Sequence, residues 1–392
     1  MNKKLRIGLF GFGVVGQGLY DVLHKTKGIN AEVVKICVKH RDKPRILHPE
    51  YFTFDKNEIL DDDSLDIVVE LIDNADEAFE IVSAALRKGK AVVSANKKMI
   101  AEHLEELYNI QQETGSPLLY EAAVCGSIPI IRNLEEYYDN DLLDSLDGIC
   151  NGTTNYILTK TSEENKTYAE ALKEAQVKGF AESNPRLDVQ AFDPKYKLAI
   201  LLNHTFGLFV KPEEIFNFGI QNLSAEDSIF AREKGFRTKL IAHTSKLNGK
   251  VVGYVIPTFV RLDNMFYEVR NEFNAVQLGA AFSDKQFFYG KGAGSHPTAS
   301  AVLSDISALV YRYRYAYKKV EQNGALPFSN AHLIEVYLRY TDKALLNELE
   351  VTDIRQRFSS NETQYVIGKV SINALLKANL NDRDDVFVAK WN

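Results

Sequence analysis

Short apolar runs alternate with amphipathic stretches through the first third of the chain. The predicted strands are Leu5–Phe10, Ala31–Val38, Leu65–Ile72, Ala91–Ser94 and Pro117–Glu121, and the stretches 77–88 and 98–113 have helical spacing. A near-continuous apolar run is typical of a strand covered on both faces of a parallel sheet. The alternation predicts an α/β fold, with an N-terminal Rossmann-type doubly wound sheet over residues 1–128.

The pattern changes after residue 128. Helices at 129–137 and 167–178 mix with strands at 142–150, 250–262, 275–279 and 287–290, which predicts an α+β domain over 129–290. A glycine-rich turn then leads into a long helix to about Lys318, so we expect 291–320 to complete the first domain. After a linker at 323–327, residues 328–392 read as a small α/β module with strands at 333–340, 364–370 and 386–390 and helices at 344–357 and 372–380.

A glycine motif lies between the first strand and the first helix. It consists of Gly11, Phe12, Gly13, Val14, Val15 and Gly16. GxGxxG in this position is typical of dinucleotide binding, because the glycines allow a tight turn and close approach of the pyrophosphate to the helix N-terminus. We expect these six residues to bind the cofactor; a glycine-rich turn without a ligand is the alternative.

The end of the second strand bears on which cofactor binds. A cofactor without a 2′-phosphate is usually held there by an acidic residue, whereas this chain has Lys39 and Arg41. These cations favour NADP(H) over NAD(H). Asp42 could still serve a ribose, and a solvated basic rim is the alternative.

Two further residues of the first domain are chemical candidates. Lys97 follows the carboxyl end of a strand, where doubly wound sheets bind ligands, so it is a candidate for the nicotinamide or substrate end. A surface lysine before a helix is the alternative. Cys125 could be the nucleophile of an acylating aldehyde dehydrogenase, but no histidine lies close in sequence, and a buried inert cysteine is expected.

The stretch 179–202 is a polar loop that runs into an apolar helix. Asp193 followed by Pro194 predicts the helix start, with the carboxylate as its cap. Lys197 lies four residues later, and a cation there opposes the helix dipole. The loop therefore suggests a site for a small charged molecule, or else a capped helix with an ordinary ion pair. The polar turn 151–155 suits a carboxylate, and the second glycine-rich turn, with Gly292, should cover the cofactor.

Composition limits the partners and the setting. The chain has 392 residues and a formal net charge of −6, with a pI near 5.9, which argues against nucleic acid or an anionic membrane as partner. No apolar run reaches the length of a membrane span. Cys37, Cys125 and Cys150 are too few and scattered for a disulfide framework or zinc site, so a cytoplasmic protein is expected.

The motifs over residues 5–320 together resemble the homoserine dehydrogenases. In order they are GFGVVG (11–16), SANKK (94–98), EAAVCGSIPII (121–131), NGTTNYIL (151–158), GFAES (179–183), PRLD (185–188), KYKLAIL (195–201) and GKGAGSHPTASAV (290–302). The resemblance implies NAD(P)-dependent interconversion of L-homoserine and L-aspartate 4-semialdehyde, in the route to threonine, methionine and isoleucine. It also implies a homodimer or homotetramer, with residues 129–290 as the substrate-binding and dimerisation domain.

The resemblance also assigns roles by position. Lys197, Lys97 and Asp193 match active-site residues, whereas Glu182, Asp188, Gly152 and Thr153 match substrate-binding residues. Glu121 and the carbonyls of Val124, Gly126 and Ile128 match a site for a monovalent cation, Na⁺ or K⁺.

The chain departs from the family pattern at several positions. Cys125 and Ser127 replace usual glycines beside the cation site, Ala191 stands where glycine is common, and Phe180 often is tyrosine. Asn184 stands where aspartate is common. Many members end in an ACT domain that senses threonine; the predicted tail is one strand short of that pattern, so we expect only an ACT-like remnant and weak or no threonine inhibition.

Two other functions fit parts of the chain. An acylating semialdehyde dehydrogenase would need Cys125 as nucleophile, and a Cys125→Ser variant that retains activity would exclude it. An idle NADP(H)-sensing protein would keep the glycine loop and lose the lysines and carboxylates, which this chain keeps.

Overall fold

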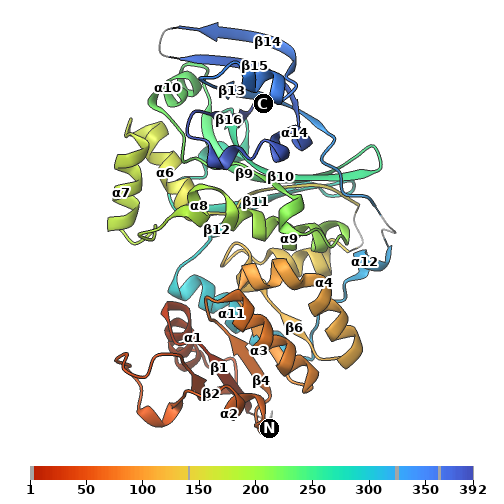
Figure 1. The fold of residues 1–392 in the computed structure, drawn as a ribbon. Coiled ribbons are helices and arrows are strands. Elements are labelled where there is room, and N and C mark those ends of the chain that lie inside the picture. The colour runs from red at the N-terminus through yellow and green to blue at the C-terminus, as the bar shows by residue number, and fades with distance from the viewer. Residues whose placement is uncertain (1–3, 140–141, 323–325, 361–362, 392) are drawn as a thin grey trace. The chain divides into compact units, whose positions relative to one another are not determined.

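The computed structural model describes residues 4–139, 142–322, 326–360 and 363–391. The chain forms two compact units (Figure 1). Unit 1 comprises Met1–Tyr137 and Lys291–Lys318, and unit 2 comprises Tyr138–Gly290 and Lys319–Asn392. The segment predicted as a separate C-terminal module, 328–392, belongs to unit 2.

Unit 1 is built on a six-stranded parallel sheet in the order β3-β2-β1-β4-β5-β6. The strands are β1 Leu5–Phe10, β2 Ala31–Cys37, β3 Phe52–Thr53, β4 Ile67–Glu70, β5 Ala91–Ser94 and β6 Leu118–Leu119. The helices are α1 Val14–Lys25, α2 Asn57–Leu60, α3 Ala75–Arg87, α4 Lys97–Thr114, α5 Ile130–Arg132 and α11 Ser295–Val310. This strand order is that of dinucleotide-binding folds, so the predicted Rossmann-type sheet is confirmed.

Local signals set the helices that follow the central strands. The Asn74 side chain accepts the N–H of Glu77 at the start of α3, and Asn96 accepts the N–H of Met99 at the start of α4. Helix α4 ends at Gly115, whose φ of +71° suits glycine. These caps begin both helices directly after the carboxyl ends of β4 and β5.

Helix α11 brings the chain back to unit 1, where it packs beside α1 (Figure 1). A Cβ on Gly18 of α1 would lie 2.5 Å from Oγ of Ser295, so only glycine allows this approach. The Ser295 hydroxyl donates to the Val14 carbonyl at 2.9 Å. The helix ends at Val310 and not near Lys318 as predicted, and Arg312 follows with φ +60°.

Unit 2 contains a mixed ten-stranded sheet in the order β12-β11-β7-β9-β10-β16-β13-β15-β14, with β8 paired to β10. The strands are β7 Leu143–Ile149, β8 Phe216–Asn217, β9 Arg237–Leu247, β10 Lys250–Val260, β11 Phe273–Ala280, β12 Asp284–Lys291, β13 Leu333–Arg339, β14 Thr352–Ser359, β15 Gln364–Ser371 and β16 Phe387–Lys390. The helices are α6 Gly152–Glu163, α7 Tyr168–Val177, α8 Arg186–Val189, α9 Phe192–Phe206, α10 Ala225–Glu233, α12 Lys318–Gln322, α13 Ala344–Glu348 and α14 Ile372–Lys377. Strand β9, central in this sheet, was not predicted.

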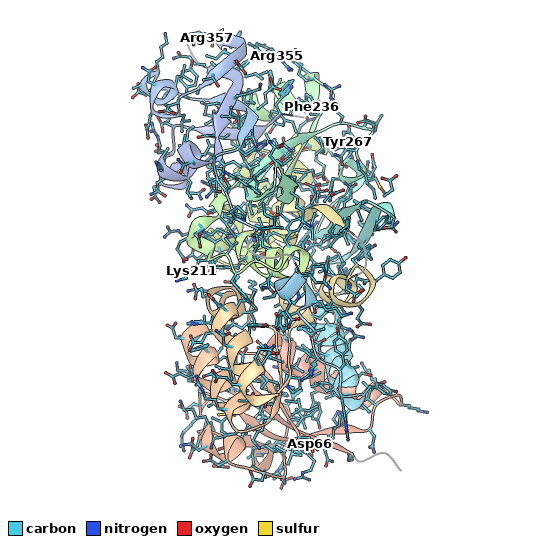
Figure 2. All side chains as sticks on the ribbon, turned by 90° about the vertical axis from the view of Figure 1, so that its right-hand side faces the viewer. Asp66, Lys211, Phe236, Tyr267, Arg355 and Arg357 are labelled. Atoms are coloured by element: carbon cyan, nitrogen blue, oxygen red, sulfur yellow. The ribbon has the colours of Figure 1, made fainter. Side chains whose placement is uncertain are left out.

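The C-terminal segment corrects one prediction from the sequence. The helix expected at 344–357 ends at Glu348, and strand β14 follows, with Arg355 and Arg357 at the outer edge of the sheet (Figure 2). The segment therefore has the β-α-β-β-α-β order of ferredoxin-like folds, with strands in the order β16-β13-β15-β14. Strand β14 is the strand that the prediction lacked. Weak or no threonine inhibition was expected because this strand was thought to be absent, so that argument was wrong.

The predicted helix 129–137 is a short α-helix, α5, continued by a π-helix over Asn133–Tyr137. The predicted linker at 323–327 lies partly outside the described residues. Within the described ranges, no helix has both the length and the apolarity to cross a membrane.

Candidate active site

The predicted cofactor loop forms a tight turn at the end of β1. Gly11 has φ +92°, and a Cβ there would lie 2.6 Å from the Leu71 carbonyl oxygen, so the position requires glycine. A Cβ on Gly16 would lie 2.5 Å from the Gly11 oxygen, whereas one on Gly13 would meet nothing within 4 Å. Helix α1 begins at Val14 without an acidic residue in its first turn. Its N–H groups and dipole can therefore face a pyrophosphate.

The other residues of the motif divide between core and surface. Phe12 is buried and packs edge-on against Phe52, with ring centroids 5.5 Å apart, so it presents only its backbone to a ligand. Val14 is exposed, and Val15 is partly buried. Gly292 is buried in the segment that leads back to unit 1 before α11. A Cβ on Gly126 would lie 2.5 Å from the Gly292 carbonyl oxygen, so the two backbones are in close contact.

The basic residues after β2 lie on the surface. Lys39 is exposed, with Nζ 3.8 Å from a carboxylate oxygen of Glu77 in the first turn of α3. The guanidinium of Arg41 lies over the ring of Phe54, 4.5 Å from its centroid. Both an acidic and a basic group therefore occur where the ribose of a dinucleotide is usually held.

A buried acid at the end of β4 organises the carboxyl edge of the parallel sheet. Glu70 is fully buried; its oxygens accept the Ser94 hydroxyl at 2.6 Å and the Ile72 N–H at 2.7 Å. Burial raises the pKa of Glu70 to about 7. Asn96 donates to the Ile72 carbonyl at 3.0 Å, so the network ties together the loops after β4 and β5.

Lys97 is the first residue of α4 and is partly buried directly after this network. Lys97 was a candidate from the sequence, whereas Glu70 was not. An acidic residue that closes an apolar strand at the carboxyl edge was the available signal.

The turn that matches a cation site is buried in unit 1. The Glu121 oxygens accept the N–H groups of Ile131 at 2.8 Å and Arg132 at 2.9 Å, and burial raises its pKa to about 7. Cys125 and Gly126 both have φ +53°, which turns the chain between the expected carbonyl ligands. Among the described residues, no group of three His, Cys, Asp or Glu could hold a metal ion. A cation here would rest on one carboxylate and backbone carbonyls, which is an oxygen set suited to a hard ion.

Cys125 itself is fully buried, as predicted for an inert cysteine. Its left-handed φ shows why glycine is common at this position.

The expected substrate residues of unit 2 converge on one lysine. Lys197 is 7% exposed, and its ammonium donates to Oδ2 of Asp193 at 2.7 Å and to the Cys150 carbonyl at 2.6 Å. The Asn151 amide nitrogen donates to Asp193 at 2.8 Å and to Asp188 at 2.7 Å. Both carboxylates and the lysine are thus held from the end of β7.

Asp193 does not cap its helix, contrary to the prediction. Helix α9 begins at Phe192, and its N-cap is Ala191 in the left-handed conformation, without a side-chain cap. Asp193 lies inside the first turn and is 3% exposed. Its carboxylate accepts hydrogen bonds from Lys197 and Asn151.

The polar turn 151–155 is the start of a helix. The Asn151 oxygen accepts the Thr154 N–H at 2.8 Å and caps α6. A Cβ on Gly152 would lie 2.7 Å from the Glu272 carbonyl oxygen, which explains the glycine. The Thr153 hydroxyl donates to the Phe180 carbonyl at 2.5 Å and so anchors the loop before Glu182.

Glu182 stands apart from this cluster. Its side chain is exposed, and its carbonyl accepts the Gln176 amide at 3.1 Å. The structure thus brings together Lys197, Asp193 and Asp188 but leaves Glu182 on the adjoining loop.

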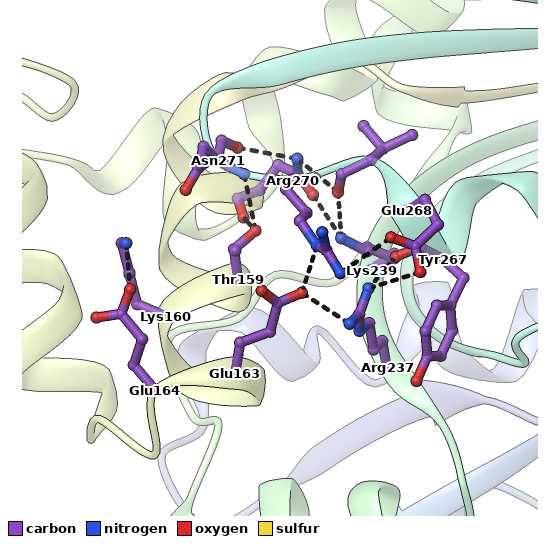
Figure 3. Close-up of polar contacts among 12 residues, drawn as sticks. Thr159, Lys160, Glu163, Glu164, Arg237, Lys239, Tyr267, Glu268, Arg270 and Asn271 are labelled. Carbon is purple, nitrogen blue, oxygen red and sulfur yellow. Dashed lines mark hydrogen bonds and ion pairs between the residues drawn. The ribbon is translucent and has the colours of Figure 1, made fainter.

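A second buried lysine, missed by the sequence analysis, lies on β9 (Figure 3). Lys239 is 2% exposed and donates to the Val269 carbonyl and, at 3.3 Å, to Oδ1 of Asn155 in α6. Burial, with the charge of Arg237 nearby, lowers its pKa to about 7. Glu163 pairs with Arg237 at 2.9 Å beside it. Because β9 was not predicted, no sequence pattern pointed to this residue.

The two units thus carry complementary chemistry. Unit 1 has an open helix N-terminus behind a glycine turn, which suits a dinucleotide phosphate. Unit 2 has a buried ammonium held by a carboxylate, and such a group can stabilise an oxyanion or transfer a proton to it.

Comparisons with known proteins agree with this division. The family model "Homoserine dehydrogenase, NAD binding domain" matches residues 11–121, and "Homoserine dehydrogenase" matches residues 129–307. A homoserine dehydrogenase of Bacillus subtilis is 38% identical over 80% of this chain and 74% of its own.

Two solved structures are also similar. A homoserine dehydrogenase from Thiobacillus denitrificans matches with a TM-score of 0.86 and 30% identity, over 100% of this chain and 98% of that one. A hyperthermophilic archaeal homoserine dehydrogenase in complex with NADPH has a TM-score of 0.69 and 28% identity, over 80% and 99% of the two chains. The matches cover residues of both units, and the chain belongs to the homoserine dehydrogenase family of oxidoreductases.

Proposed function

We propose that this protein interconverts L-homoserine and L-aspartate 4-semialdehyde with a nicotinamide dinucleotide, in the route to threonine, methionine and isoleucine. The observation that carries the proposal is the buried Lys197 ammonium, held by Asp193 and the Cys150 carbonyl. Membership of the family supplies the reaction class.

Lys197 handles the proton in this proposal. The dinucleotide, when bound, exchanges a hydride with C4 of the substrate, which leaves or removes charge on the C4 oxygen. Lys197 stabilises that oxygen and gives it a proton in the reductive direction, or takes the proton in the oxidative direction. Asp193 holds the ammonium in place and balances its charge. Lys97, at the end of β5, is proposed as the second cation, at the nicotinamide end.

The amino-acid end of the substrate needs the opposite charges. We assign Asp188 and Glu182 to the α-ammonium group, because carboxylates form strong charge-assisted hydrogen bonds with it. Gly152 and Thr153 are assigned to the carboxylate, through N–H groups at the start of α6. The Thr153 hydroxyl is bonded to the Phe180 carbonyl, so its part is chiefly to fix the loop that carries Glu182.

We propose that NADP(H) is preferred over NAD(H). Lys39 and Arg41 supply positive charge after β2, where a 2′-phosphate would lie. Glu77 beside Lys39 is the group that a ribose hydroxyl would use instead. The archaeal relative bound to NADPH is consistent with this preference.

The remaining assignments concern the cation and the assembly. We propose that Glu121, with the carbonyls of Val124, Gly126 and Ile128, binds Na⁺ or K⁺ and so rigidifies the turn beside Gly292. We also expect a homodimer or homotetramer, which light scattering on the purified protein measures directly.

The test is a spectrophotometric assay of homoserine oxidation with NAD⁺ and NADP⁺ side by side. We expect oxidation with both and a higher kcat/KM with NADP⁺. In Lys197→Ala, turnover should fall by about 10²- to 10⁴-fold, because proton transfer and oxyanion stabilisation are lost. NADP(H) affinity should change little.

Lys195→Ala is the matched control. Lys195 lies on the same helix, but its ammonium lies over the Phe192 ring, 4.8 Å from the centroid, so near-normal turnover is expected. Near-normal turnover of Lys197→Ala would exclude the assigned role. Wild-type protein without homoserine oxidation would exclude the proposed function.

A further inference from the structure

A three-residue segment, 189–191, runs from the last residue of α8 to the residue before α9 in unit 2; we call it the strap. Asp188 immediately precedes it and Asp193 follows it by two residues. The strap therefore links two carboxylates of the candidate site, which the Asn151 amide also holds.

The strap contains a strained residue. Ala191 has φ +64° and ψ +24°, a left-handed conformation that costs a residue with a Cβ more than it costs glycine. Such conformations persist only where the surrounding contacts determine them. Ala191 is fully buried, so those contacts come from within the protein.

Segment 217–221, which begins in β8, contacts the strap on one side. The Ile220 N–H donates to the Val189 carbonyl at 2.7 Å, and the Asn217 amide donates to the Gln190 carbonyl at 2.7 Å. A Cβ on Gly219 would lie 1.8 Å from the Val189 oxygen, so the two backbones are in direct contact.

Asn381 joins the strap to the C-terminal segment. Its amide nitrogen donates to the carbonyls of Gln190 at 3.3 Å and Asn217 at 2.9 Å. Its amide oxygen accepts the Gly219 N–H at 3.3 Å and the Gln221 amide at 3.1 Å. One side chain from the end of the chain thus bonds both the strap and the segment that supports it.

The two helices beside the strap differ in how firmly they are held. Helix α8 has four residues, of which only Val189 is buried. Helix α9 has fifteen residues, and twelve of them are buried, including Asp193 and Lys197. Loosening the strap should therefore displace Asp188 and leave Lys197 in place.

We propose that Asn381 is a positioning residue for the substrate site, which holds the strap so that Asp188 faces the amino group of the substrate. The inference rests on the proposed function, because it uses the role assigned there to Asp188. It also gives the C-terminal segment a part in substrate binding.

The test separates KM from kcat. In Asn381→Ala, the KM for homoserine should rise by about tenfold. The variant loses a support for the strained conformation of Ala191, and the free-energy cost of a left-handed residue corresponds to a change of about this size in an equilibrium constant. The kcat and the KM for the dinucleotide should stay near wild type. Asn381→Asp should behave similarly, because it keeps the acceptor but lacks the donor to Gln190.

Asn330→Ala is the matched control, since it removes a hydrogen bond of 2.7 Å from the Asn330 amide to the Glu214 carbonyl, which does not involve a residue of the strap. It should leave the KM unchanged. Ala191→Gly should restore the KM in the Asn381→Ala background, because glycine adopts the left-handed conformation without that support.

The outcomes decide separately between the two proposals. Active wild-type protein with an unchanged homoserine KM in Asn381→Ala would overturn the inference, as would an equal KM rise in Asn330→Ala or no rescue by Ala191→Gly. Wild-type protein inactive on homoserine would overturn the proposed function instead. If Asn381→Ala does not fold, the KM of Asn381→Asp decides.

Discussion

Lys239 offers a test of whether this fold holds a lysine in its uncharged form. The side chain is 2% exposed, and burial, with nearby Arg237, lowers its pKa from 10.5 to about 7. Lys239→Met removes the titrating group and keeps an unbranched apolar side chain of similar length. The Val269 carbonyl and the Asn155 oxygen each lose a donor in this variant, but that cost does not depend on pH.

The size of the effect follows from proton linkage. An unfolded lysine holds its proton up to its ordinary pKa of 10.5, whereas the folded one releases it near 7. The unfolded state therefore binds more protons between these values, and the free energy of unfolding rises with pH there. Relative to Lys239→Met, the wild type should gain roughly 2.5 kcal/mol between about pH 6 and pH 9, nearly all of it above pH 7.

Denaturant unfolding followed by tryptophan fluorescence measures this difference. The only tryptophan of the chain, Trp391, lies in unit 2 against Phe236, with ring centroids 4.9 Å apart, so its signal reports the unit that contains Lys239. Lys250→Met, at an exposed position, is the control and should show no pH-dependent difference. A constant difference between wild type and Lys239→Met over this range would mean that Lys239 stays charged, and the reasoning from burial would be refuted.

Three further outcomes are expected. Lys39→Glu should lower kcat/KM with NADP⁺ by about tenfold or more and change the value with NAD⁺ much less, because a charge-assisted contact is lost. Asp227→Ala should lower the free energy of unfolding by about 3–5 kcal/mol, because the fully buried carboxylate bonds Arg339 at 2.9 Å; an unchanged denaturation midpoint would contradict this. Lys197→Met should lower the free energy of unfolding by about 3 kcal/mol, because it leaves the buried Asp193 carboxylate without its partner charge. Adding Asp193→Asn should restore the stability but not the activity; a denaturation curve without recovery would mean that the pair is structural.

The Rossmann-type half could be predicted because its signals are local. Strands β1 and β5 begin and end at the predicted residues, since each is a short, mostly apolar and largely buried run that begins directly after a lysine, Lys4 or Lys90. Strand β14 gave no such signal. It is an edge strand with most side chains exposed, and it exists because it pairs with β15. Its residues are mostly polar and follow the short helix α13, so in the sequence they resemble a continuation of that helix. In the structure the helix ends before Glu350, which has φ +50°.

The candidate site shows the same limit. The ion pair of Asp193 and Lys197 was predictable from their i,i+4 spacing. The capping role given to Asp193 was wrong, because Ala191 turns the chain in the left-handed conformation and leaves the carboxylate inside the helix. Asn151 reaches both Asp188 and Asp193 from some forty residues earlier, and only the folded chain brings these residues together.

The position of Lys197 is best explained by chemistry and not by stability. It is a cation near the N-terminal end of α9, where the helix dipole disfavours it, and it is buried with Asp193. A buried ion pair stabilises a fold little more than apolar residues of the same volume would. Yet the Cys150 carbonyl and the Asn151 amide both contribute hydrogen bonds to this pair. Two residues between β7 and α6 thus combine with Asp193 of α9 to hold one ammonium where an apolar side chain would serve packing. A proton-handling role accounts for that arrangement.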